Sequence, residues 1–163
     1  MKKILLAGAV LSIVVYMVMA GCSKSKSGNS GCIDQPVTAD SSALLSFARN
    51  NGLSPVKDNT GLYYQIISQG YGSTAPGIGS TISVTYTGTR LDGVVFDSTG
   101  ATARSFALSN LIPAWQIGMP KIKAGGHIKL LVPSALGYGC LGIQNFIPSN
   151  TPIYFDITLV SVQ

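Results

Sequence analysis

The 163-residue chain contains no glutamate, and charged residues make up only 10% of it. It has one histidine and three cysteines, and no pair of cysteines has the C-x-x-C spacing that is typical of zinc sites. Its basic residues give a formal charge of +5 but are scattered along the chain. We therefore expect no metal centre, no cofactor and no nucleic-acid partner, since nucleic-acid binding needs a basic stripe. Recognition should instead rest on apolar and hydrogen-bonding groups.

The N-terminus has the layout of a secretory signal peptide, because Lys2 and Lys3 precede an uncharged apolar run over residues 4–20. The motif Met19-Ala20-Gly21-Cys22 resembles the lipobox of bacterial lipoproteins. That resemblance implies cleavage of residues 1–21 and attachment of palmitate-type acyl chains to Cys22. The chain would then be anchored to the lipid bilayer in the bacterial cell envelope. Ser23 and Lys24 favour the outer membrane, since no aspartate follows Cys22. The alternative is an uncleaved transmembrane anchor, because the apolar run reaches the lower edge of a bilayer span.

Two segments precede the region of alternating residues, a polar one over residues 22–31 and one with a short helical pattern over residues 32–60. Residues 22–31 are rich in Ser, Lys and Gly and are expected to form a flexible tether. Residues 32–60 form an N-terminal extension with one short helix, which Asp40 can cap and Gly52 can end. A helix of about three turns is too short for a coiled-coil dimerisation arm. We therefore expect a monomer.

From residue 61 to residue 163 the apolar residues recur with a period of two, which is typical of half-buried strands. The alternation is clearest around Ile82–Tyr86, Ile128–Val132 and Ile153–Leu159. Asp92-Gly93 is a hairpin signal, and Pro113 fits the first turn of a short helix that carries Trp115. Antiparallel strands with one short central helix indicate an α+β domain.

Six short segments in this region combine apolar residues with turn signals: Val84–Gly88, Asp92–Ser98, Leu111–Trp115, Leu136–Gly139, Ile147–Asn150 and Ile153–Ile157. In this order and at these distances they closely resemble the FKBP-type peptidyl-prolyl cis-trans isomerases. The resemblance implies an antiparallel sheet half-wrapped around a short central helix, with an apolar cleft between them. It also implies that the chain accelerates rotation about X-Pro bonds in unfolded or folding envelope polypeptides and that macrolide immunosuppressants inhibit it.

Matched residue by residue, the resemblance implies a catalytic pocket that is mostly aromatic. Trp115 would be its floor, the Ile112 amide and the Tyr138 hydroxyl would hold carbonyl groups, and Asp97 would be its one charged wall. The full set is Tyr86, Phe96, Asp97, Phe106, Leu111, Ile112, Trp115, Tyr138, Ile147 and Phe155.

Other interpretations of these residues stay open at this point. The fold could serve as a non-catalytic module that binds prolyl peptides or acts as a chaperone. The chain could also be a structural lipoprotein whose aromatic residues all belong to the core. Asp97 could bond the amide of Ser98 or Thr99 in an Asx turn.

If Cys22 is acylated, two cysteines remain, Cys32 and Cys140, which is an even number. In an oxidising envelope compartment this favours a disulfide between Cys32 and Cys140, which would pin the start of the folded region to the loop after Tyr138. The alternative is two unrelated thiols.

Overall fold

A computed structural model describes residues 31–163 of the chain. The predicted signal peptide, the lipobox at Cys22 and nearly all of the tether lie outside the described residues. Residues 32–163 form one compact unit. Within residues 31–163, no helix is both long and apolar enough to cross a bilayer.

The part of the chain that the structure describes folds into seven strands, two α-helices and three 3₁₀ turns. The helices and turns are α1 (Ser41–Asn50), η1 (Leu108–Asn110), α2 (Pro113–Gly118), η2 (Met119–Lys121) and η3 (Ser134–Leu136). The strands are β1 (Val56–Lys57), β2 (Tyr63–Ser68), β3 (Thr81–Arg90), β4 (Val95–Ser98), β5 (Arg104–Ala107), β6 (His127–Val132) and β7 (Ile153–Val162).

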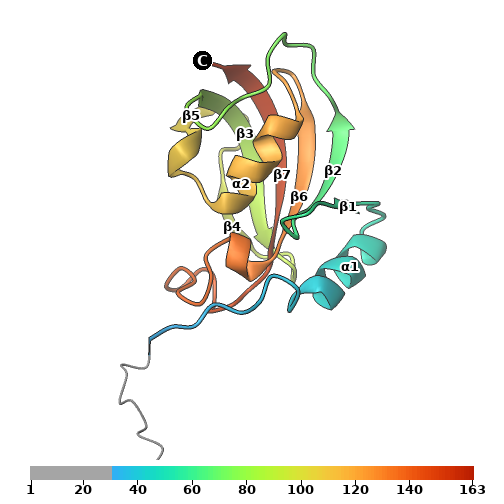
Figure 1. The fold of residues 1–163 in the computed structure, drawn as a ribbon, viewed down its shortest axis with the longest axis vertical. Helices are drawn as coiled ribbons and strands as arrows, with labels where there is room; N and C mark the ends of the chain where they lie inside the picture. The colour runs from blue at the N-terminus through green and yellow to red at the C-terminus, as the bar shows by residue number, and fades with distance from the viewer. Residues whose placement is uncertain (1–30) are drawn as a thin grey trace, which may run out of the picture. The chain divides into compact units, whose positions relative to one another are not determined.

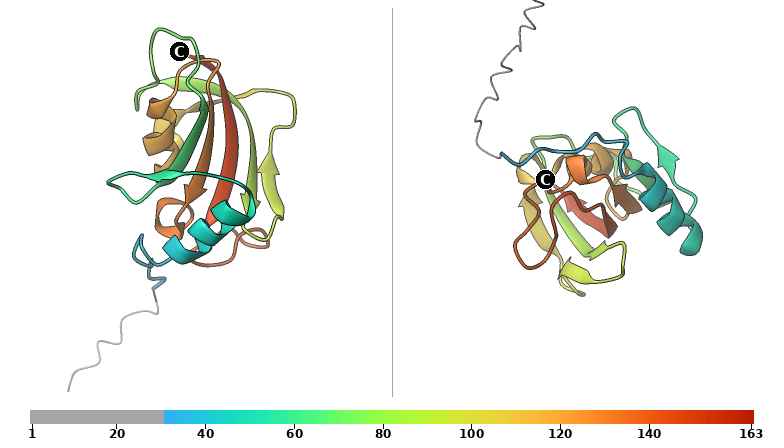
Figure 2. Two further views of the ribbon diagram at one scale, coloured as in Figure 1. Left: turned by 90° about the vertical axis from the view of Figure 1, so that its right-hand side faces the viewer. Right: turned by 90° about the horizontal axis from the view of Figure 1, so that it is seen from below.

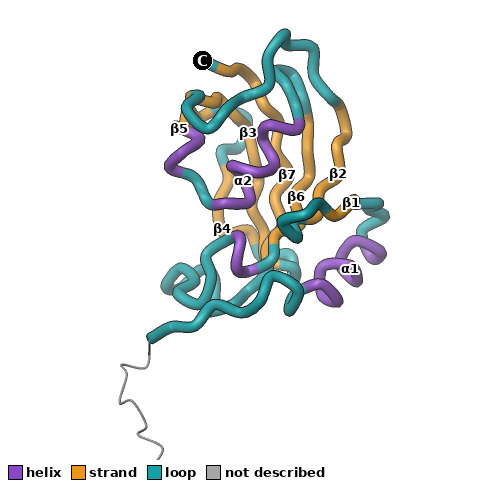
Figure 3. The backbone as a smooth tube through the Cα atoms, viewed as in Figure 1, coloured by secondary structure: helices purple, strands orange, loops and turns teal. Residues whose placement is uncertain are grey.

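All strand pairs in the sheet are antiparallel, and the strand order is β1-β2-β6-β7-β3-β4 (Figure 1). β3 pairs with β7 along one edge, and along the other it pairs first with β5 and then with β4. The β3–β4 connection is the predicted hairpin, in which the Gly93 N–H donates to the Arg90 carbonyl and Gly93 has a φ of 87°. The long β6–β7 connection lies at the end of the sheet where the described chain begins (Figure 3).

The alternation in the sequence corresponds to the two faces of the sheet. In β3 the side chains of Ile82, Val84 and Tyr86 are buried, whereas the intervening residues are half exposed. The side view in Figure 2 shows α2 lying against one face of the sheet. That face and α2 enclose the main core, which includes Trp115 and Met119. The predicted α+β arrangement is confirmed.

The opposite face of the sheet is covered at one end by α1. Leu44 and Ala48 of this helix pack with Tyr63 and Leu131 in a second, smaller apolar cluster. The helix ends as expected, because Gly52 follows it with a φ of 64°, a conformation that favours glycine.

The prediction that the Asp40 carboxylate caps α1 is wrong. Asp40 occupies the N-cap position, but its side chain makes no capping hydrogen bond. Its Oδ2 instead accepts hydrogen bonds from the Ser134 N–H and hydroxyl, at 2.8 and 2.7 Å. Both residues are buried, so this contact satisfies a carboxylate that would otherwise be costly to bury.

Candidate functional site

A cavity of about 230 Å³ opens between α2, the sheet and the loop before α2. It brings together all of the residues predicted from the sequence except Phe96 and Ile147, and it adds Asn110. The lining residues are Tyr86, Asp97, Phe106, Asn110, Leu111, Ile112, Trp115, Tyr138 and Phe155. Pockets for small molecules usually measure about 300–1,000 Å³, so this cavity suits a single small ring.

Trp115 forms the floor of the cavity because α2 turns it toward the sheet. Pro113 occupies the first helical position, where its missing N–H costs nothing, so α2 starts two residues before Trp115. The indole is 3% exposed and meets the rings of Tyr86 and Phe155 edge-on, with ring centroids 5.1 and 5.3 Å apart. These T-shaped contacts fix the orientation of the floor.

Phe96 does not line the cavity but packs against two residues that do, Tyr138 and Phe155. Its ring packs edge-on against Phe155 at 5.5 Å and against Tyr138 at 6.2 Å. Gly88 makes this packing possible, because a Cβ there would lie 2.7 Å from both Phe96 and Phe155. The sequence analysis did not single out Gly88.

Ile147 lies away from the cavity that Trp115 floors. Its side chain is 2% exposed and packs in the main core. It borders a different cavity of about 350 Å³ beside Arg90 and Phe146. Its contribution is therefore to hold the loop between η3 and β7.

A hydrogen bond from Tyr86 orients the Asp97 carboxylate, and both residues line the cavity. The Tyr86 hydroxyl donates to Asp97 Oδ2 at 2.5 Å. The Asx-turn interpretation fails for Thr99, because the Thr99 N–H donates to the Tyr86 carbonyl instead. Burial, and then the hydrogen bond to Asp97, raise the pKa of the Tyr86 phenol well above its ordinary value of 10. The phenol therefore remains a donor at neutral pH.

Two further donors face the cavity without a protein partner. Among residues 31–163, neither the Ile112 N–H nor the Tyr138 hydroxyl donates a hydrogen bond to the protein. Ile112 has an extended backbone just before α2, so its N–H lies outside the helical hydrogen bonds. Burial, and then the charge of Asp97, raise the pKa of Tyr138. Both groups can thus donate to the carbonyl oxygens of a bound chain.

Gln116 holds the loop that presents the Ile112 amide, and no sequence motif pointed to this role. Its Nε2 donates to the Leu111 carbonyl at 2.7 Å and to the Ser109 carbonyl at 3.1 Å. Asn110 was also missed. Gln116 lies in α2 and Asn110 in η1, and a single amide side chain carries no periodicity or motif from which its tertiary position can be predicted.

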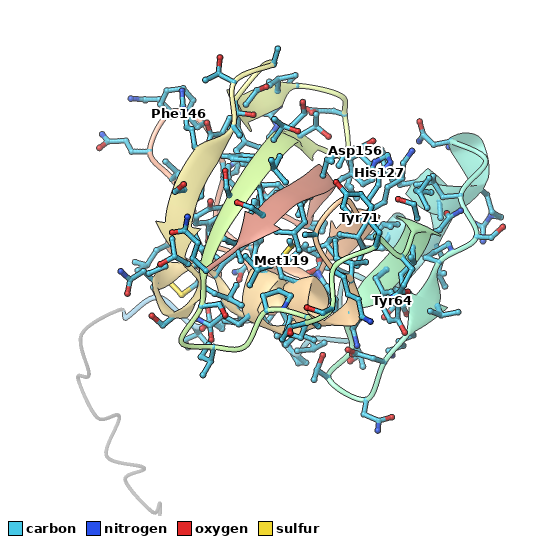
Figure 4. All side chains as sticks on the ribbon, turned by 90° about the horizontal axis from the view of Figure 1, so that it is seen from above. Tyr64, Tyr71, Met119, His127, Phe146 and Asp156 are labelled. Carbon is cyan, nitrogen blue, oxygen red and sulfur yellow. A yellow bond between two sulfur atoms is a disulfide. The ribbon has the colours of Figure 1, made fainter. Side chains whose placement is uncertain are left out.

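A cluster of charged side chains joins β6 and β7 on the face of the sheet opposite Phe155. Asp156 pairs with His127 and lies 3.5 Å from Lys129 Nζ. Figure 4 shows His127 and Asp156 beside each other, apart from Met119 and from Phe146 at the edge of the molecule. This cluster is separated from the aromatic cavity by the sheet.

A family model described as FKBP-type peptidyl-prolyl cis-trans isomerase matches residues 72–160, more than half of the chain. The chain belongs to this family. In this FKBP-type chain the region matched by the family model begins after β2. The segment before α1, α1 itself and β1 therefore lie outside the family model.

Relatives of this FKBP-type chain carry names that fit the site. It is 40% identical over 119 residues to FkpA of Escherichia coli (strain K12), and this alignment covers 72% of the chain and 43% of FkpA. It is 39% identical over 106 residues to outer membrane protein MIP of Legionella longbeachae, covering 64% and 45%. It is 33% identical over 102 residues to FK506-binding protein 1 of Debaryomyces hansenii, covering 60% and 91%. The FKBP-type chain thus spans less than half the length of FkpA and MIP.

The crystal structure of FkpA from Escherichia coli superimposes with a TM-score of 0.67 and 38% identity, covering 76% of this chain and 57% of FkpA. The expected FKBP-like fold is therefore confirmed.

Proposed function

We propose that residues 61–163 form a peptidyl-prolyl cis-trans isomerase domain whose active site is the aromatic cavity over Trp115. The observation that carries this proposal is the combination of an indole floor with two donors that have no acceptor among residues 31–163, the Ile112 amide and the Tyr138 hydroxyl. The family membership and the names of the relatives support the same activity.

The reaction requires no nucleophile, base or metal. Amide resonance sets a barrier of about 18–20 kcal/mol, so an unaided X-Pro bond rotates in about tens to hundreds of seconds. At the top of the barrier the amide is twisted and has lost much of its charge separation. A dry aromatic cavity favours this less polar amide over the planar one, relative to water. A barrier lower by about 5 kcal/mol would give roughly 10⁴-fold acceleration.

Each polar group has a separate task in this proposal. The proline ring lies on Trp115, and the Ile112 N–H donates a hydrogen bond to a peptide carbonyl and so fixes the chain across the cavity. The Tyr138 hydroxyl donates to a second carbonyl. Asp97, held by Tyr86, places negative charge beside the rotating bond and disfavours the planar amide, whose carbonyl oxygen is partly negative.

A protease-coupled assay on a short X-Pro peptide tests this proposal. We expect Tyr138→Phe to lower kcat/KM about tenfold, because one hydrogen bond to the substrate is lost. Asp97→Ala should lower kcat more than it weakens peptide binding. Tyr71→Phe and Asp92→Ala are matched controls on exposed residues outside the cavity and should leave the rate unchanged.

The non-catalytic alternative predicts a different result in the same assay. A prolyl-peptide-binding or chaperone module would bind the peptide without increasing the rate of isomerisation. No acceleration by the folded protein would therefore refute the enzymatic proposal, and retained peptide binding would favour the module.

We also propose that the chain is a monomeric lipoprotein of the bacterial cell envelope, anchored through acylated Cys22 with residues 22–31 as its tether. The name of the Legionella relative, outer membrane protein MIP, supports a location in the envelope and at the outer membrane. A mass spectrum of the native protein should show the loss of residues 1–21 and added acyl mass on Cys22. An intact N-terminus would support the transmembrane anchor instead.

The substrates and inhibitors follow from the same site. We propose that its substrates are proline-containing segments of unfolded or folding envelope proteins and that macrolides of the FK506 type compete for the cavity. The name FK506-binding protein 1 supports the second point for the yeast relative. Displacement of a proline peptide by FK506 tests it here, and simultaneous binding of both would contradict it.

A further inference from the structure

The loop that carries Tyr138 is attached at both of its ends to a segment that precedes the isomerase domain. We define the strap as residues Cys32–Asp40 and the Tyr138 loop as residues Ser134–Cys140. The family model begins at residue 72, so the strap lies outside it. Figure 3 shows the first described residues running beside the β6–β7 connection that contains this loop.

The start of the Tyr138 loop is held by Asp40. Its carboxylate accepts two hydrogen bonds from Ser134, one from the N–H and one from the hydroxyl. Asp40 is 8% exposed and Ser134 is fully buried. A buried carboxylate that accepts two hydrogen bonds is costly to disturb, because either group alone would be left without a partner.

The end of the Tyr138 loop is held twice, by a hydrogen bond and by a covalent bond. Asp34 Oδ1 accepts a hydrogen bond from the Cys140 N–H at 2.7 Å. A disulfide joins Cys32 and Cys140, whose Cα atoms lie 5.4 Å apart. Gly139 permits this approach, since a Cβ at residue 139 would lie 2.2 Å from Asp34 Oδ1.

Tyr138 lies between these attachments and borders two cavities. One is the aromatic cavity over Trp115, and the other, of about 520 Å³, is lined by strap residues Cys32 and Asp34. The Tyr138 loop is therefore not backed by packed core on the strap side. On that side the loop is held by these three attachments, whereas on the other side Leu136 and Tyr138 pack against the main core and the Asn150 N–H donates to the Gly139 carbonyl.

We propose that Asp34, Asp40 and the Cys32–Cys140 disulfide are positioning residues that hold the Tyr138 hydroxyl over the aromatic cavity. This inference rests on the proposed isomerase function. Reduction by a dithiol converts the Sγ–Sγ bond into two thiols while the dithiol is oxidised to its own disulfide. The rate of isomerisation then depends on the redox state of a disulfide that joins the family domain, at Cys140, to a segment outside it, at Cys32.

The test compares the oxidised protein with the Cys32→Ser/Cys140→Ser double variant, which leaves neither thiol unpaired. We expect kcat/KM for an X-Pro peptide to fall about tenfold, mostly through KM, because small displacements of a positioned group have large kinetic effects. Hydrogen exchange of the Gly137, Gly139 and Cys140 amides should become faster in the same variant.

A second pair of variants keeps the disulfide and the fold. Asp34→Ala should raise KM several-fold, by about the effect of one hydrogen bond, whereas Asp34→Asn should restore it because the amide oxygen still accepts from Cys140. Asp58→Ala is the matched control. Asp58 also accepts a backbone N–H and pairs with Lys121, but it lies outside the strap and the cavity.

The outcomes separate the two proposals. If the oxidised protein has no isomerase activity, the proposed function fails, and amide exchange still decides whether the strap holds the loop. Unchanged exchange and unchanged KM in the double variant and in Asp34→Ala would overturn the inference. Faster exchange with an unchanged KM in an active enzyme would overturn it as well.

Discussion

At the scale of single residues, Tyr86 connects the apolar floor of the cavity with its carboxylate. Its ring packs against Trp115, and its hydroxyl donates to Asp97. The phenol is only 9% exposed, and its pKa is raised by burial and by that hydrogen bond. The neutral phenol is therefore the form that the folded state prefers.

This preference predicts how stability depends on alkaline pH. The folded-state pKa lies above the ordinary value of 10, so the stabilisation is fully present below pH 10 and is lost as the pH rises further. Tyr86→Phe should lower the free energy of unfolding by about 1 kcal/mol at neutral pH and should make its alkaline decline shallower. Urea unfolding at neutral and alkaline pH measures both, and an equally steep decline in the variant would contradict the prediction.

The residues of the site differ in how far the sequence reveals them. Trp115, Tyr86 and Phe155 stand in motifs with recognisable neighbours, and the structure places them around one cavity. Gln116 and Gly88 act through contacts that arise only when α2, β3 and β4 come together. Local sequence carries no record of such contacts, so these two residues could not be predicted.

At the scale of elements, the backbone of α2 can approach Leu130 of β6 closely because Gly118 has no side chain. A Cβ on Gly118 would lie 2.7 Å from Leu130 Cδ2. The approach brings the helix, and with it Trp115, down onto the sheet. The absence of a side chain at Gly118 therefore lets the floor of the cavity approach the sheet.

The contact between Gly118 and Leu130 can be tested with a double-mutant cycle. Gly118→Ala should cost about 1–3 kcal/mol of stability by overpacking, and Leu130→Val should cost about 1 kcal/mol as a small cavity. The two together should cost less than their sum, since the smaller residue makes room for the new methyl group. Chemical unfolding of the four proteins measures the coupling, and simple additivity would refute direct contact.

The prediction for Asp40 shows where local patterns fail at this scale. The sequence before α1 correctly indicates a helix start, and the helix is present. The carboxylate, however, bonds Ser134, which is 94 residues away in the chain. Capping preferences describe only a local choice, and a buried partner from another element competes successfully with it.

At the scale of the whole molecule, the sheet divides two cores with different roles. The face toward α2 carries the aromatic cavity, and the face toward α1 carries the smaller cluster around Leu44 and Leu131. Alternation in the strands predicted a two-sided sheet, but the sequence alone did not show that α1 covers its outer face. That placement depends on Tyr63 and Leu131, which face away from the main core.

The division predicts that stability and catalysis can be separated. Leu44→Ala should lower the free energy of unfolding by about 2–5 kcal/mol, because the side chain is fully buried. Leu45→Ala, at a neighbouring position that is 39% exposed, should cost less than about 1 kcal/mol. Both should retain kcat/KM at temperatures where they are folded, and a selective loss of kcat/KM in Leu44→Ala would show that α1 reaches the active site.

The most direct test of the proposed activity is exchange spectroscopy by NMR on a short X-Pro peptide with a trace amount of the protein. Our account predicts that exchange between the cis and trans signals becomes faster while their ratio stays the same, and that Trp115→Leu abolishes the effect. Peptide signals that shift on binding while the exchange rate stays at its uncatalysed value would contradict it.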